Sequence, residues 1–164
     1  ATILSHEKDI EELARDFAGA RGFFFIGGGM AYPPSLEGAL KLKEISYLHA
    51  EAYPAGEMKH GPIALLDKEL PVVALVPKGR LWEKTVSNIE ESMARKSPII
   101  AVATEGDEEI KAYTKHIIYT PPTEEELFAF VAIAPLQLFA YYIARQRGCD
   151  IDMPRNLAKS VTVE

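Results

Sequence analysis

Hydrophobic residues form two alternating patterns along this chain, short uninterrupted runs and positions spaced as on one face of a helix. Short apolar runs bounded by glycine, proline or polar residues are typical of buried strands. Such runs lie at 22–29, 71–77, 98–104 and 116–121. Helical spacing, as shown by Ile10, Leu13 and Phe17, is typical of a helix with one buried face. This spacing predicts helices over 6–18, 35–50, 82–93 and 124–147.

Three sequence signals mark the ends of these helices. Pro33 and Pro34 suit a first helical turn, where the missing proline N–H would have no partner in any case. Thr123 followed by Glu126 has the spacing of a capping box and predicts the start of the last helix. Gly148 directly follows that helix and predicts its C-cap.

The order of these elements indicates the fold class. Helices between consecutive buried strands imply right-handed crossovers, which connect parallel strands. We therefore expect an α/β fold with a mostly parallel sheet covered on both faces. Such sheets bind ligands beyond the carboxyl ends of their strands. On this basis we expect Gly27–Gly29 and the helix that carries Glu44 to lie near one edge of the sheet.

Composition narrows the possible function classes. The 164 residues are 48% hydrophobic and 26% charged, as in one globular domain. A net charge of −6 argues against nucleic acid or an anionic membrane as the main partner. The single cysteine, Cys149, excludes an internal disulfide and fits a reducing compartment, so we expect a cytoplasmic protein. The apolar stretch 127–144 contains Pro135 and Gln137, which favours a buried helix over a membrane span.

Residues 41–62 gather amines, carboxylates and imidazoles in one short segment. The residues concerned are Lys41, Glu44, His49, Glu51, Lys59 and His60. The C-terminal tail adds a lone lysine, Lys159, outside any helical pattern. Sugar isomerisation uses such a set, because a carboxylate shuttles a proton between carbons, an imidazole opens the ring and an amine binds the carbonyl. We interpret His49 as structural and regard the others as candidates for this chemistry.

Glu37, Lys41 and Glu44 share one face of the predicted helix, because residues three or four apart are neighbours on a helix surface. On an arbitrary helix they would form a surface ladder of ion pairs. The Pro- and Gly-containing loop that follows, in place of a solvated linker, weakens that interpretation here. With an ordinary pKa of about 4.3, Glu44 is ionised at neutral pH and can act as a base.

Two long motifs in the chain resemble one protein family. SLEGALKLKEISYLHAEAYPAGEMKHGP at 35–62 and PRNLAKSVTVE at 154–164 resemble the C-terminal part of the glutamine–fructose-6-phosphate aminotransferases, or glucosamine-6-phosphate synthases. The resemblance begins near Phe23 and is closest to the second of that family's two sugar-isomerase (SIS) modules. It implies a three-layer α/β/α sandwich, one SIS domain over 1–164, and an active-site tail over 149–164.

The resemblance implies a role for each catalytic candidate. Glu44 would move a proton between C1 and C2 of the open-chain sugar, with Lys41 beside the substrate. His60 would open the sugar ring, acting in the site of the other subunit. Lys159 would form a Schiff base with the carbonyl of fructose-6-phosphate.

Other residues would support this site. The resemblance implies that Glu37 and Ala158 bind the substrate. Arg155 is a candidate cation for lowering the pKa of Lys159, whose amine must be neutral to attack a carbonyl. We expect no metal and no organic cofactor, because no metal-ligand motif is present and Gly27–Gly29 does not extend to a dinucleotide motif.

The resemblance also implies a reaction and a set of partners. Fructose-6-phosphate and glutamine-derived ammonia would give glucosamine-6-phosphate, in a homodimer whose first SIS module and glutaminase domain lie outside this chain. The loops GGGMAYPP, PKGR and TEGDEE lack the Ser- and Thr-rich cradle that holds a sugar phosphate. We therefore expect the chain alone to bind substrate weakly and to be inactive.

Three alternatives remain open at this point. A phosphosugar deaminase or deglycase would keep the Glu44 helix but has no need of the full RNLAKSVTVE tail. A non-catalytic sensor of sugar phosphates would need a phosphate loop and would have no use for an imine-forming lysine. A module that serves only for dimerisation would need neither a phosphate loop nor an imine-forming lysine.

Overall fold

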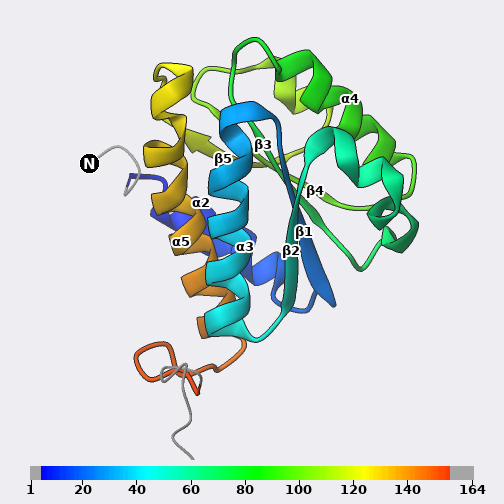
Figure 1. Cartoon of the computed structure of the whole chain (residues 1–164). Coiled ribbons are helices and arrows are strands. Elements are labelled where there is room, and N and C mark those ends of the chain that lie inside the picture. Colours follow the sequence, from blue (N-terminus) through cyan, green and yellow to red (C-terminus); the bar gives the residue numbers. More distant parts are fainter. Residues whose placement is uncertain (1–4, 156–164) are drawn as a thin grey trace, which may run out of the picture.

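The computed structural model describes residues 5–155, which form a five-stranded sheet between two layers of helices (Figure 1). The strands are β1 (Gly22–Gly27), β2 (His49–Pro54), β3 (Val72–Val76), β4 (Ile99–Thr104) and β5 (His116–Thr120). The helices are α2 (Glu7–Phe17), α3 (Tyr32–Ser46), α4 (Trp82–Met93) and α5 (Phe128–Gln146). All neighbouring strands pair in parallel, in the order β2-β1-β3-β4-β5. This arrangement confirms the expected α/β/α sandwich.

The side chains of β1 fill both hydrophobic cores, because successive side chains of a strand point to opposite faces. Phe23 and Phe25 pack in the core beneath α2, α3 and α5, and Phe24 packs in the core beneath α4. Gly38 lets α3 approach its neighbours closely, since a Cβ there would lie 3.0 Å from carbons of Phe25 and of Leu136 on α5. Strand β1 thus packs against both helical layers.

Helix α3 differs from the predicted helix over 35–50 at both ends. It begins at Tyr32, with proline in its first turn as the sequence indicated. It ends at Ser46, because Tyr47 adopts a left-handed backbone conformation with φ 60° and ψ 15°. The chain then forms β2, so the placement of His49 on a helix is wrong. Strand β2 could not be predicted from the sequence, because this half-exposed edge strand carries no apolar run.

Helix α5 begins later than predicted, and the expected capping box is wrong. Glu125–Leu127 form a 3-10 turn, and α5 starts at Phe128 without a side-chain cap. The predicted end is confirmed, since Gly148 has a left-handed φ of 68°. The backbone N–H of Gly148 donates to the carbonyl oxygen of Arg145, and that of Cys149 donates to the carbonyl oxygen of Ala144, both at 3.0 Å. These two hydrogen bonds form a Schellman motif.

By length and composition alone, the segment Glu125–Gln146 could cross a membrane. Half of its apolar window is buried inside the protein. It packs against α2 and α3, and contributes Phe128, Phe139 and Ile143 to the core. These contacts are those of the core helix that the sequence favoured.

Candidate active site

Lys41 and Glu44 form a close ion pair on α3. The Nζ of Lys41 donates to Oε2 of Glu44 at 2.8 Å and lies 3.7 Å from Oε1 of Glu37. The three side chains are between 29% and 36% exposed, so solvent or a substrate can reach them. This geometry is common to a surface ladder of ion pairs and to a catalytic carboxylate held by an amine.

The ion pair determines the protonation state of Lys41. The hydrogen bond to Glu44 raises the pKa of Lys41 above its ordinary value, and the charge of Glu37 adds to this effect while partial burial opposes it. Lys41 is therefore protonated at neutral pH. A protonated amine has no lone pair to attack a carbonyl, so Lys41 is suited to orienting Glu44 or an anionic group of a substrate.

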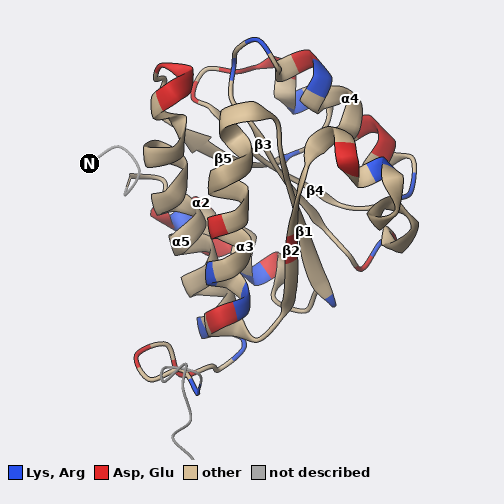
Figure 2. Ribbon diagram, in the orientation of Figure 1, with Lys and Arg blue, Asp and Glu red and all other residues tan. Residues whose placement is uncertain are grey.

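The expectation that Gly27–Gly29 and the helix that carries Glu44 lie near one edge of the sheet holds for the start of that helix, but not for Glu44 itself. The glycines follow β1 at what we term the carboxyl edge, where the strands end. Helix α3 starts there and runs back along β1, because a crossover helix must return to the start of the next parallel strand. His49, three residues after α3, pairs with Gly22 at the start of β1. The Lys41–Glu44 pair thus lies toward the opposite, amino edge, where Figure 2 shows blue and red on the end of α3.

His60 lies at the carboxyl edge, far from Glu44 of the same chain. It is exposed, at the end of the 3-10 segment Ala55–His60 that follows β2. The six residues of β2 separate this segment from the end of α3 and span about 20 Å at strand geometry. One sugar cannot contact both side chains across that length. His60 and Glu44 therefore do not form a site within one chain.

The chain beyond α5 returns to the amino edge and contacts the end of α3. Nε of Arg147 donates to the carbonyl oxygen of Ser46 at 3.3 Å. Sγ of Cys149 donates to the same oxygen at 3.7 Å. Ala158 and Lys159 lie outside the described residues. The last described part of the tail thus begins beside the helix end that carries the Lys41–Glu44 pair.

Tyr47 and Arg155 make the last described contact between the tail and the body of the protein. The backbone N–H of Arg155 donates to Oη of Tyr47 at 2.9 Å, and its guanidinium lies 4.0 Å from the centre of the tyrosine ring. The guanidinium of Arg155, the candidate cation for Lys159, faces Tyr47, and its distance from Lys159 lies outside the described residues. Tyr47 could not be predicted as a contact of the tail, because a tyrosine after a helix carries no sequence signal for such a contact.

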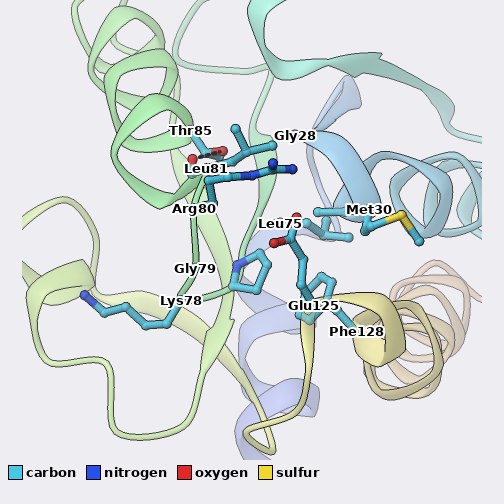
Figure 3. A pocket seen from close by; sticks show the side chains of 12 residues that line it. Gly28, Met30, Leu75, Lys78, Gly79, Arg80, Leu81, Thr85, Glu125 and Phe128 are labelled. Carbon is cyan, nitrogen blue, oxygen red and sulfur yellow. Dashed lines mark hydrogen bonds between the residues drawn. The ribbon is translucent and has the colours of Figure 1, made fainter.

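The strand order reverses between β1 and β3, which is where parallel sheets usually bind ligands. The cavity at this point measures about 20 Å³, and Leu75, Leu81 and Phe128 are among its lining residues (Figure 3). A cavity needs roughly 10–15 Å³ for one water, whereas small-molecule sites measure roughly 300–1,000 Å³. A sugar phosphate does not fit there.

A more open groove of about 420 Å³ lies beside this cavity, between the end of β2 and α4. Lys59, Lys84, Thr85 and Asn88 are part of its lining. The Thr85 hydroxyl and the Asn88 amide donate to carbonyl oxygens within α4, to Leu81 and Lys84. The groove therefore differs from the Ser- and Thr-rich loop expected of a module that holds a sugar phosphate by itself.

The described residues offer no metal site. Within 5–155, no three His, Cys, Asp or Glu side chains lie close enough together to hold a metal ion.

Comparison with known proteins adds a family and a set of close relatives. The SIS domain family matches residues 16–145. The chain is 56% identical over 162 residues to a glutamine–fructose-6-phosphate aminotransferase (isomerizing) of Thermus thermophilus, and 51% identical over 161 residues to that of Aquifex aeolicus. These matches cover 99% and 98% of this chain but only 27% of each relative.

A solved structure gives the same result. The C-terminal domain of glucosamine-fructose-6-phosphate aminotransferase from Francisella tularensis matches with a TM-score of 0.84 at 39% identity. The match covers 92% of this chain and 43% of that chain.

Proposed function

The chain belongs to the SIS domain family, and on that premise we propose that it is the sugar-isomerase module of a glutamine–fructose-6-phosphate aminotransferase. Its relatives carry that name over almost the whole of this sequence. The observation that carries the proposal is the 2.8 Å Lys41–Glu44 pair at the amino edge, beside the point where the C-terminal tail leaves the body. The carboxylate that we propose as the base therefore lies close to the described start of the tail.

The proposed reaction uses these groups in sequence. His60 opens the ring of fructose-6-phosphate by moving a proton between the ring oxygen and the anomeric hydroxyl. The Lys159 amine attacks the C2 carbonyl and releases water to form an imine, which ammonia then displaces. Glu44 removes a proton from C1 and returns it to C2, which converts the ketose imine into the 2-amino aldose. The product is glucosamine-6-phosphate, and the overall proton balance is zero.

The geometry supports a division of labour between the two lysines. The pKa of Lys41 is raised by its hydrogen bond to Glu44, so its amine is charged at neutral pH. That charge holds the carboxylate and attracts the anionic substrate. The covalent step therefore falls to Lys159, whose role rests on the match of its tail to the family.

The active enzyme would contain more than this module. Because the chain spans 27% of the length of its relatives, we propose that a preceding SIS module and a glutaminase domain complete it.

Helices α3 and α5 lie side by side (Figure 1) and expose Leu36, Leu40 and Phe130, the last to 75%. The preceding module is the partner we propose for this apolar surface. A homodimer in the cytoplasm would bring His60 to the site of the second subunit.

A non-catalytic sensor of sugar phosphates fits the structure less well. Such a module needs its own phosphate pocket at the point where the strand order reverses. The cavity of about 20 Å³ at that point has no room for one, and in the open groove beside it the Thr85 hydroxyl and the Asn88 amide already donate to carbonyl oxygens of Leu81 and Lys84.

Replacing Glu44 tests the proposed function. In the full-length enzyme, Glu44→Gln keeps the shape of the side chain but cannot accept a proton. We expect deuterium exchange at C1 of fructose-6-phosphate to slow by at least about 100-fold, as is typical when a general base is removed. Binding of fructose-6-phosphate should stay within about threefold, because the carboxylate acts on the proton and not on the phosphate.

Glu90→Gln is the matched control, because Glu90 is an exposed glutamate on α4, in the helical layer opposite Lys41 and Glu44. This variant should exchange deuterium at nearly the normal rate. Normal exchange in the Glu44→Gln enzyme would show that another residue is the base.

A further inference from the structure

Tyr47 stands where the backbone would favour glycine. It ends α3 in a left-handed conformation, with φ 60° and ψ 15°, and its N–H donates to the carbonyl oxygen of Lys43 at 3.2 Å. Glycine adopts this conformation freely, whereas a residue with a Cβ meets steric resistance. The helix end itself therefore does not require a tyrosine, and the side chain must be considered for another role.

The Tyr47 side chain contacts both the backbone and the side chain of Arg155, far along the sequence. Its hydroxyl accepts the Arg155 N–H at 2.9 Å, and its ring lies under the Arg155 guanidinium at 4.0 Å. The first contact fixes the path of the main chain, and the second, a cation–π contact, favours arginine over an uncharged residue. We refer to this pair as the tail anchor.

The tail anchor shortens the stretch of chain between the last described contact and Lys159. Without it, the preceding contact of the tail with α3 is at Cys149, ten residues before Lys159. With it, the last contact is at Arg155, four residues before Lys159. Four residues reach at most about 14 Å. The effective concentration of a tethered group rises as its tether shortens, with a power of about 3/2. Shortening the tether from ten to four residues therefore raises the effective concentration of Lys159 roughly fourfold.

The position of the anchor matches the place where the lysine is needed. Tyr47 lies three residues beyond Glu44, less than one helical turn along the chain. We propose that Tyr47 is a positioning residue, which holds Arg155 at the amino edge so that the tail delivers Lys159 to the sugar handled by Glu44. This inference rests on the proposed function, since it takes the imine role of Lys159 from it.

The test uses Tyr47→Gly in the full-length enzyme. Glycine suits the left-handed backbone, so the helix end is preserved while the anchor is lost. At saturating fructose-6-phosphate, we expect borohydride trapping of the Lys159 adduct to slow by about fourfold or more. The KM for fructose-6-phosphate should change by less than about twofold, because Tyr47 is not proposed to contact substrate. Trapping at the normal rate would overturn the proposal.

Two further variants keep the test decisive if Tyr47→Gly folds poorly. Tyr47→Phe retains the ring and the cation–π contact but cannot accept the Arg155 N–H, so its trapping rate should fall between those of the parent enzyme and Tyr47→Gly. Tyr141→Phe is the matched control, a partly exposed tyrosine of α5 outside the anchor, and should trap normally. A defect in Tyr47→Phe no larger than that of Tyr141→Phe would refute the anchoring role.

Lys159→Arg separates failure of this inference from failure of the proposed function. If Lys159 forms the imine, Lys159→Arg abolishes trapping, and adding Tyr47→Gly has no further effect because both changes act on one step. If Lys159→Arg still traps the sugar, the proposed function fails at its covalent step, whatever Tyr47 does. If Lys159→Arg is inert but Tyr47→Gly traps normally, the inference about Tyr47 alone is wrong.

Discussion

At the level of single residues, the ion pair on α3 determines the charge of Lys41. Glu44 lies 2.8 Å from Lys41 and raises its pKa above the ordinary value of 10.5. A raised pKa means that the charge of Lys41, and any stability it contributes, is fully present below pH 10.5 and is lost only as the pH rises through the higher value. Across the neutral range Lys41 is a fixed cation, not a nucleophile.

Lys41→Arg tests this assignment. Arginine keeps the charge and can still donate to Glu44, but it cannot form an imine at any working pH. In the full-length enzyme we expect the borohydride-trapped adduct to persist, with kcat reduced by no more than about tenfold for the altered geometry. Peptide mapping by mass spectrometry should place the adduct on Lys159. Loss of the adduct in this variant would transfer the imine role to Lys41.

At the level of elements, Asp107 ties the loops of the carboxyl edge together. Its buried carboxylate accepts the indole N–H of Trp82 on α4 at 2.7 Å and lies 3.3 Å from Nζ of Lys78, which follows β3. It also accepts the N–H of Glu109 at 3.1 Å, at the start of the 3-10 segment Glu109–Ala112. One side chain thus joins the segments that follow β3 and β4.

Asp107→Ala should therefore destabilise the module strongly. The change leaves the indole N–H of Trp82 and the backbone N–H of Glu109 without their acceptor, which typically costs about 1–3 kcal/mol of the free energy of unfolding. Urea unfolding followed by the fluorescence of Trp82, the single tryptophan, measures this directly. Glu108→Ala is the control, since Glu108 is exposed and pairs only with the nearby Lys111 in the contacts seen here. Equal stability of the two variants would show that Asp107 does not join these segments.

At the level of the whole molecule, the sheet separates the two proposed proton-transfer residues. Glu44 lies toward the amino edge, and His60 follows β2 at the carboxyl edge. The separation of about 20 Å along β2 exceeds the size of one hexose. A site that uses both residues must therefore combine two chains, and a two-fold symmetric dimer does so twice.

Mixing two inactive full-length variants tests this arrangement. Glu44→Gln and His60→Ala should each be inactive alone. After subunit exchange, half of the dimers are hybrids, and each hybrid has one intact site, so we expect roughly one quarter of the normal activity. A different affinity tag on each variant, with purification on both tags in sequence, establishes that exchange has occurred. If the exchanged mixture remains inactive, both residues belong to the same chain's site or one is not catalytic.

Local sequence patterns determined most of the elements of this protein and the residues of its candidate site. Strand and helix periodicity depends on residues close together in the chain, so α2, α4 and the buried strands could be predicted to within a few residues. The motif around Glu44 nominated the Lys41–Glu44 pair, which the structure brings within 2.8 Å. The capping box before α5 was wrong, because a matching spacing does not ensure that the backbone turns there.

Only the tertiary structure decided how these parts are placed. Strand β2 lies at the edge of the sheet and pairs only with β1. Most of its side chains are therefore only partly buried, and its sequence has no apolar run. That strand sets Glu44 and His60 at opposite edges, although they are 16 residues apart in sequence. The contact between Tyr47 and Arg155 joins residues 108 positions apart. Sequence periodicity is local, whereas these features depend on which distant segments the fold brings together.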